Sequence, residues 1–156
     1  MRQSTLIFVM NPKEEILLAM KKRGFGEGKW NGAGGKVEAG ETVEAAAVRE
    51  LREETGIDVP ESKLESVGIL HFTFEGKPDW NQDVNVFFVR DYVGPDGIET
   101  EEMRPEWFTL DKIPFDDMWA DDPYWLPRVL EGDKVDFSFT FDADGDLAEV
   151  VEGYVG

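Results

Sequence analysis

The stretch GGKVEAGETVEAAAVRELREETGI (residues 34–57) sets a helix directly behind a glycine-rich loop. Thr42 is a residue type that caps helix N-termini with its side-chain oxygen, and most of the residues that follow are good helix formers. Gly56 is the residue type that most often ends a helix, because glycine adopts the left-handed backbone conformation without strain. The pattern therefore predicts a helix from Thr42 to Thr55.

The predicted helix carries Glu50, Glu53 and Glu54 within an arc of about 100° on one face. Like charges this close destabilise an isolated helix by roughly a few tenths of a kcal/mol per pair. Two interpretations stay open. The face is either a solvated acidic surface, or a set of hard oxygen ligands for Mg²⁺ or Mn²⁺. Arg49 is either an ordinary surface cation or a partner that orients one of the glutamates.

The charge of the whole chain restricts its partners. Its 156 residues include 16 basic and 34 acidic ones, which gives a net charge of −18. This excess argues against binding to nucleic-acid polymers or to anionic membranes, and a phosphate-bearing small molecule would need a cation as intermediary. The surplus acid outside any motif also fits a protein adapted to a salty cytoplasm.

Length and composition predict one domain over residues 1–156, which we expect to be a monomer. No apolar run approaches the roughly 20 residues that span a bilayer, and the N-terminal apolar stretch is too short for a secretory signal. The chain has no cysteine, which fits a cytoplasmic protein.

Apolar β-rich runs and two helical segments alternate along the chain, which predicts an α+β fold in which a mixed sheet packs against two helices. Strands are expected over Thr5–Met10, Ile16–Met20, Leu64–Glu75, Val84–Val93 and Glu106–Leu110, with a hairpin from Phe137 through Asp144-Gly145 to Leu147–Val151. We expect Lys21–Lys36 to be a loop with one short strand at most. Pro123 favours the start of a second helix over Asp122–Leu130.

The spacing of the acidic helix points to a known family. Five residues separate Gly35 from Glu41, and seven separate Glu41 from the run RELREETGI (residues 49–57). Every defined position of this pattern matches the Nudix box, so the chain resembles the Nudix hydrolases. The resemblance implies a Nudix fold, an α/β/α sandwich with a mixed sheet between helices, in which the box forms a loop–helix–loop.

The same resemblance implies hydrolysis of a nucleoside diphosphate linked to another group, with Mg²⁺ as cofactor and Mn²⁺ as an alternative. Such metals neutralise the phosphates and lower the pKa of a bound water. The implied metal ligands are Gly34, Glu50, Glu53, Glu54 and Glu102. The implied catalytic residues are Glu50, Glu53, Glu54, Glu102 and Arg49, and the resemblance does not decide which glutamate is the base. We expect the glycines to let the chain turn so that the Gly34 carbonyl joins the ligands.

Stretches beyond the box narrow the resemblance to the mammalian MutT-homologue branch of the family, which hydrolyses oxidised purine nucleoside triphosphates. They are MKKRGFGEGKWNGAGGK (residues 20–36), VGILHFTFEGKP (67–78), EMRPEWF (102–108) and IPFDDMWADDPYWLP (113–127). The resemblance implies that the purine is read by Asn31, Trp119, Asp121 and Asp122, within a wall of Phe25, Phe72 and Phe74 and a rim of Thr5 and Lys21. An indole stacks on a flat base, and two aspartates with an amide match its polar edge. An aspartate that is protonated in an apolar pocket also becomes a donor.

The expected reaction is Mg²⁺-dependent hydrolysis of oxidised purine nucleoside triphosphates, such as 8-oxo-dGTP or 2-hydroxy-dATP, to the monophosphate and pyrophosphate. This activity would sanitise the nucleotide pool. One alternative is a Nudix pyrophosphatase acting on ADP-ribose, dinucleoside polyphosphates or unmodified dNTPs. Another is a non-catalytic nucleotide-binding module, against which the intact box argues.

Several of these residues also have plainer local interpretations. Asp121 and Asp122 precede a proline and are residue types that cap helices. The phenylalanines, taken alone, are more often core residues than residues of a pocket wall. We expect Trp30 to be a packing residue and His71 to be structural or a rim group.

The chain departs from the MutT-homologue pattern that it resembles at three places near the expected pocket. Gln82 stands near a position where that pattern has methionine, an extra residue is inserted around Trp80-Asn81, and Ala33 replaces a bulkier aromatic residue. These departures leave the preference among oxidised and ordinary purines open.

Overall fold

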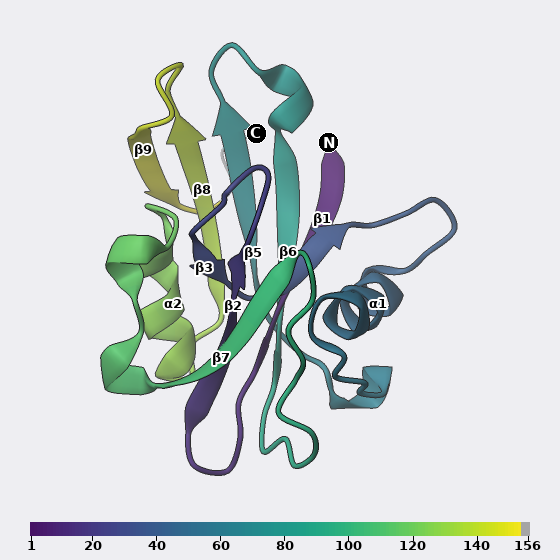
Figure 1. Cartoon of the computed structure of the whole chain (residues 1–156). Coiled ribbons are helices and arrows are strands. Elements are labelled where there is room, and N and C mark those ends of the chain that lie inside the picture. Colours follow the sequence, from purple (N-terminus) through teal and green to yellow (C-terminus); the bar gives the residue numbers. More distant parts are fainter. Residues whose placement is uncertain (154–156) are drawn as a thin grey trace.

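A mixed six-stranded sheet forms the centre of the fold (Figure 1). The computed structural model describes residues 1–153. The strand order is β4-β1-β6-β5-β8-β9, with β1 parallel to β6 and β5 parallel to β8, and the other neighbours antiparallel. These strands are β1 (Arg2–Val9), β4 (Ala33–Lys36), β5 (Glu65–Phe74), β6 (Gln82–Val89), β8 (Val135–Phe141) and β9 (Leu147–Glu152).

A smaller antiparallel sheet, ordered β3-β2-β7, lies in front of the first in Figure 1. Its strands are β2 (Glu15–Lys21), β3 (Trp30–Asn31) and β7 (Met103–Thr109). The predicted turn at Asn11–Lys13 is present, because the Asn11 side-chain oxygen accepts hydrogen bonds from the backbone of Lys13 and Glu15. The chain passes there from the large sheet into the small one.

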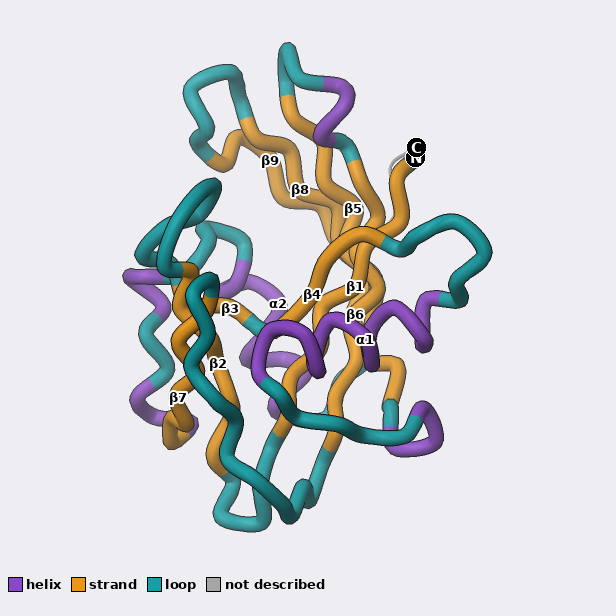
Figure 2. Tube along the Cα trace, turned by 45° about the vertical axis from the view of Figure 1, so that its right-hand side comes forward, coloured by secondary structure: helices purple, strands orange, loops and turns teal. Residues whose placement is uncertain are grey.

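Two helices flank the large sheet (Figure 2). The helix α1 (Val43–Thr55) packs against β1 and β4, whereas α2 (Asp122–Leu130) packs on β8 from the other side. The predicted α+β fold, with a mixed sheet between two helices, is therefore confirmed. The small sheet adds to it, and the segment Lys21–Lys36 contains two short strands instead of at most one.

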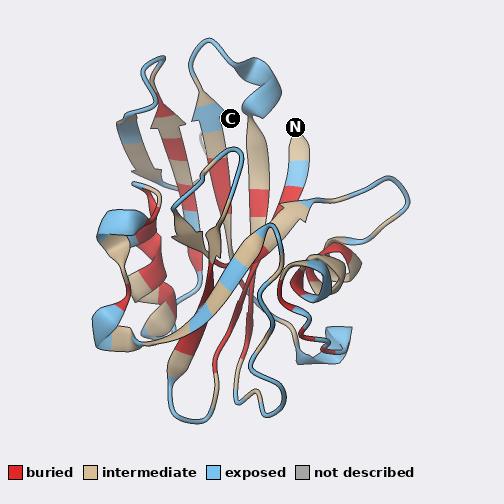
Figure 3. Cartoon of the chain, viewed as in Figure 1, coloured by how far each residue is buried: buried red, intermediate tan, exposed pale blue. Residues whose placement is uncertain are grey.

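Two apolar cores fill the spaces on either side of β1 and β2 (Figure 3). Ile16 and Leu18 of β2 belong to the core that includes α2, while Leu17 between them belongs to the core under α1. Alternate side chains of a strand point to opposite faces, so β2 is buried on both sides. Within residues 1–153, no helix has the length and apolar character needed to cross a membrane.

Candidate active site

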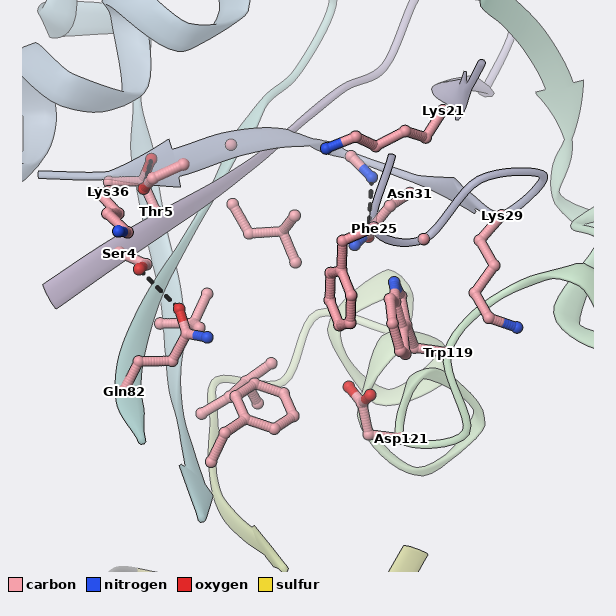
Figure 4. A pocket seen from close by; sticks show the side chains of 18 of the residues that line it. Ser4, Thr5, Lys21, Phe25, Lys29, Asn31, Lys36, Gln82, Trp119 and Asp121 are labelled. Carbon is pink, nitrogen blue, oxygen red and sulfur yellow. Dashed lines mark hydrogen bonds between the residues drawn. The ribbon is translucent and has the colours of Figure 1, made fainter. Parts of the chain in front are cut away.

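A cavity of about 630 Å³ opens between the large sheet and the layer formed by the small sheet and α2 (Figure 4). Most of its wall is apolar, from β1, β5, β6 and β8, and a few polar groups enter from its edges. Residues that carry polar groups, aromatic rings or backbone into the cavity wall include Arg2, Ser4, Thr5, Lys21, Phe25, Lys29, Asn31, Gly34, Glu54, Phe72, Phe74, Trp80, Gln82, Trp119, Asp121 and Asp122.

The acidic helix α1 begins and ends as its sequence predicts. The Thr42 side chain accepts a hydrogen bond from the Ala45 backbone at 3.1 Å, and Gly56 closes the helix with φ of 76°. Ala46, Ala47 and Leu51 are buried under the helix. Burying this stripe against the sheet leaves Glu50 and Glu54 beside β4, where the Gly34 N–H donates to a Glu54 carboxylate oxygen at 3.4 Å.

The glycines of β4 are needed for space. A side-chain carbon at Gly34 would collide with the Thr5 carbonyl oxygen of the paired strand, and one at Gly35 would lie 2.6 Å from a carboxylate oxygen of Glu50. Neither glycine has a positive φ. The predicted requirement for glycine is thus met, but its physical reason is the close approach of backbone and carboxylates rather than a turn.

Arg49 organises the acidic cluster. Its guanidinium donates to Glu41 through two nitrogens at 2.7 and 3.0 Å, to Glu50 at 2.8 Å and to Glu53 at 3.1 Å. These bonds hold the pKa of Glu41 down at about 2, and the carboxylates raise the pKa of Arg49. Arg49 is therefore a fixed cation that orients its neighbours, in agreement with the positioning interpretation.

Glu54 and Glu50 are the carboxyl groups of the cluster whose pKa values are raised. Burial, and then the charge of Glu50, raise the pKa of Glu54 to about 8, and burial raises the pKa of Glu50 as well. Two adjacent carboxylates in a partly buried place disfavour their own ionised forms. Carboxylate oxygens whose ionised forms are disfavoured by burial and mutual repulsion are suited to a hard divalent cation, which would relieve that repulsion.

The predicted metal ligands do not all lie close together in this structure. Glu53 is exposed and turned to Arg49, and Glu102 is paired with Arg23 at 2.7 Å on the surface. Within residues 1–153, no three acidic, histidine or cysteine side chains form a ready metal site. The roles of Glu53 and Glu102 at a metal therefore stay predictions.

Trp119, Asp121 and Asp122 lie together at the opposite end of the cavity from Gln82. Asp121 accepts a hydrogen bond from the Trp125 indole at 2.9 Å, and Asp122 accepts one from the Trp119 backbone at 3.0 Å. Asp121 occupies the residue before α2 in a helical conformation and makes no capping bond. The helix-cap interpretation thus fails for Asp121, because its carboxylate is engaged elsewhere.

Both aspartates are almost fully buried, at 4% and 1% exposure. Burial raises the pKa of Asp121 to about 6, and burial together with the charge of Asp121 raises the pKa of Asp122 well above its usual value. A carboxyl that is neutral near pH 7 donates a hydrogen bond as well as accepting one. The pair can therefore present both donors and acceptors to a bound molecule.

Phe25 bridges the two walls of the cavity. Its ring stacks on Trp119 with centroids 5.3 Å apart, and its other neighbour is Trp80, edge-on at 5.1 Å. Phe25 is 61% exposed, and it stands in a loop where Gly24 and Gly26 both have φ of 83°. In Figure 4 the rings of Phe25 and Trp119 lie nearly parallel inside the cavity.

The other predicted pocket residues also reach the cavity wall. Asn31 fixes its side chain by accepting a bond from the Gly32 backbone at 2.9 Å. Thr5 is buried and its hydroxyl faces the Gly35 carbonyl at 3.5 Å. The remaining residues with a predicted role here are Lys21, Phe72 and Phe74, all of which line the cavity.

Sequence reasoning did not assign every wall residue to the cavity, and those it missed include Arg2, Ser4, Lys29, Lys36 and Trp80. The only local sign that Ser4 faces the cavity is its position two residues before Leu6, because residues two apart in a strand lie on the same face. Trp30 packs edge-on against Phe108 at 5.0 Å, as a packing residue should.

His71 of β5 lies between two aspartates of the large sheet. Its ring nitrogens are 2.7 Å from Asp83 and 3.0 Å from Asp136, which stand on the two neighbouring strands. This arrangement supports a structural role.

The family model described as NUDIX domain matches residues 1–129. The chain belongs to the Nudix family. Members of this family generally use a divalent metal.

This Nudix chain is 50% identical over 140 residues to the mouse oxidized purine nucleoside triphosphate hydrolase, covering 90% of the chain and 86% of the relative. It is 51% identical over 127 residues to the zebrafish protein of the same name, covering 81% and 78%. Among solved structures, a MutT protein from Bacillus halodurans superimposes with a TM-score of 0.83 at 28% identity, covering 97% of both chains.

Proposed function

We propose that this Nudix protein hydrolyses oxidised purine nucleoside triphosphates to the monophosphate and pyrophosphate. One observation carries the proposal: a single cavity is lined both by Gly35 and Glu54 of the Nudix box and by Trp119, Asp121 and Asp122. A purine held at the second group has its phosphates within the same cavity as the first. The mouse and zebrafish relatives, named for this activity, support the assignment.

The residues proposed to hold a divalent cation are Glu50 and Glu54, with the Gly34 carbonyl, Glu53 and Glu102 as further ligands. Mg²⁺ is the proposed ion and Mn²⁺ an alternative. When bound, the metal would neutralise phosphate charge and supply a water of lowered pKa. Arg49 holds Glu50 and Glu53 in place. Lys21, which lines the cavity, would offer a positive charge to the substrate.

The base is proposed to be recognised at both its face and its edge. Trp119 offers an indole face for stacking, and Asn31, Asp121 and Asp122 offer donors and acceptors to the polar edge. Phe25, Phe72, Phe74 and Thr5 complete the wall. Since the pKa values of both aspartates are raised, the pair has a donor available near neutral pH, which suits more than one purine tautomer.

The proposal extends to the domain organisation, the location and the partners of the protein. The continuation of the large sheet into β8 and β9, beyond the matched family region, supports one domain over the whole chain. We expect a cytoplasmic monomer whose partner is the nucleotide alone, without nucleic-acid polymer or membrane.

A substrate panel tests the proposal. The purified protein with MgCl₂ is given 8-oxo-dGTP, 2-hydroxy-dATP, dGTP, dATP, ADP-ribose and a dinucleoside polyphosphate, and the products are separated. We expect monophosphate and pyrophosphate from the oxidised purines with the highest kcat/KM. Preference for ADP-ribose or dinucleoside polyphosphates would overturn the proposal, and binding without turnover of any compound would indicate a non-catalytic module.

A further inference from the structure

A hydrogen-bonded pair, Ser4 of β1 and Gln82 of β6, interrupts the apolar wall of the cavity opposite the aspartates. The Ser4 hydroxyl is buried and donates to the Gln82 side-chain oxygen at 2.7 Å. The two residues belong to neighbouring parallel strands, in which Ser4 pairs with Val84 and Gln82 with Arg2. Both side chains line the same cavity as Trp119 and Asp121.

The bond from Ser4 fixes which way the Gln82 amide points. With the oxygen engaged by Ser4, the nitrogen and its two hydrogens are directed away from β1. One hydrogen is used in a long bond of 3.4 Å to the Trp80 carbonyl. In Figure 4 the Gln82 nitrogen points toward the side of the cavity that carries Phe25, Trp119 and Asp121, so the second hydrogen is available to a ligand.

The surroundings of this amide are mixed, because Arg2 of the paired strand also lines the cavity and donates to the same Trp80 carbonyl at 3.5 Å, whereas the rest of the wall on this side is largely apolar. The apolar wall residues include Leu6, Leu70, Phe72, Phe74, Val84 and Phe141. A donor whose direction is fixed affects specificity, because a ligand without a matching acceptor leaves that donor without a partner in the complex.

The shape of a purine determines which atom the donor would meet. A purine whose six-membered edge faces Asp121 and Asp122, and whose long axis spans the cavity, would turn its C8 end toward the opposite wall, which carries Gln82. Oxidation at C8 replaces a C–H group, which accepts nothing, with a carbonyl oxygen. Oxidation at C2 adds its oxygen at the other end of the base, near the aspartates.

We propose that Gln82, oriented by Ser4, is a specificity-determining residue that donates a hydrogen bond to the C8 carbonyl oxygen of purines oxidised at C8. This inference rests on the proposed function and narrows it. The preferred substrates are C8-oxidised purine nucleoside triphosphates, and those oxidised at C2 gain nothing from the pair. Ser4 is a positioning residue, because it acts through Gln82.

The test compares Gln82→Met, which keeps the length of the side chain and removes the donor, with the wild type. We measure kcat/KM for 8-oxo-dGTP, dGTP, 2-hydroxy-dATP and dATP. The ratio of 8-oxo-dGTP to dGTP is expected to fall about tenfold, the scale of one neutral hydrogen bond. The ratio of 2-hydroxy-dATP to dATP is expected to stay within about twofold, since its extra oxygen is remote from Gln82.

Ser4 provides the second arm of the test. Ser4→Ala frees the amide to rotate and should lower the 8-oxo-dGTP to dGTP ratio, whereas Ser4→Thr keeps the hydroxyl and should restore it. Thermal melting of each variant checks folding, and a purely structural role would lower all four kcat/KM values by one factor without moving either ratio.

Each outcome separates this inference from the proposed function. If the wild type hydrolyses 8-oxo-dGTP but Gln82→Met leaves the 8-oxo-dGTP to dGTP ratio unchanged, or shifts both ratios alike, the role of Gln82 is refuted and the proposed function stands. If the wild type hydrolyses none of the four nucleotides, the proposed function itself fails.

Discussion

Replacing Glu54 by glutamine should stabilise the metal-free protein while abolishing its turnover. The pKa of Glu54 is raised from 4.5 to about 8 by burial and by the charge of Glu50. Between those two pH values the folded protein binds more protons than the unfolded chain, so its stability falls as the pH rises from about 4.5 to about 8. Glutamine keeps the volume of the side chain and never acquires the charge.

The size of this stability difference follows from the pKa shift of Glu54. At about 1.4 kcal/mol per pKa unit, the wild type loses at most roughly 5 kcal/mol at a pH above 8. Local relaxation and water reduce this loss, so we expect Glu54→Gln to gain about 2–5 kcal/mol. For a domain of this length that raises Tm by about 5–15 °C.

The assay is thermal unfolding in EDTA at pH 5 and pH 8.5. The gain should appear at pH 8.5 and nearly vanish at pH 5, where both proteins carry a neutral group at this position. Glu53→Gln is the matched control, because it removes an exposed carboxyl from the same helix and should leave Tm nearly unchanged. A Glu54→Gln variant no more stable than wild type at pH 8.5, or equally stabilised at both pH values, would refute the reasoning.

Three further predictions concern catalysis, recognition and charge. Glu53→Gln should lower kcat by about 100-fold or more at saturating Mg²⁺, as expected for a metal ligand or its close partner; near-normal kcat would remove Glu53 from the catalytic set. Asp121 changes from donor to acceptor as the pH rises through about 6, so the wild-type ranking of purine substrates by kcat/KM should change across that pH, and Asp121→Asn should abolish the change. Because the net charge is −18, adaptation to salt predicts a Tm that keeps rising with KCl beyond the range where screening saturates, and a Tm that is flat up to molar KCl argues against it.

Local signals in the sequence were sufficient for the elements that carry the chemistry. Thr42 and Gly56 delimit α1 because capping depends on a few neighbouring residues. The residues of the Nudix box and of the base site were accessible through resemblance. Their convergence on one cavity was not visible locally, since it depends on pairing between strands distant along the chain, such as β1 with β6.

The residues that the sequence did not reveal depend on contacts between such distant strands. Ser4 has a role at the cavity only through its hydrogen bond to Gln82, which is 78 positions away in the sequence. Trp80 reaches the cavity through its ring contacts with Phe25 and Phe74, which belong to distant or separate segments of the chain. Glu102 looks like a metal ligand in the sequence, yet Arg23 holds it in this structure, because an ion pair is available to it on the surface.

The stacking of Phe25 on Trp119 changes how much free energy a base gains by stacking on the indole. The indole is already covered by an aromatic ring in the free protein, so a purine that takes this face exchanges one ring contact for another. Its gain is the difference between two stacking free energies, and not the whole of the roughly 1–3 kcal/mol that a base–aromatic contact contributes elsewhere. Little new apolar surface leaves water in such an exchange, so stacking should contribute only weakly to the heat-capacity change of binding. Discrimination among bases then falls to the polar groups around the ring edges.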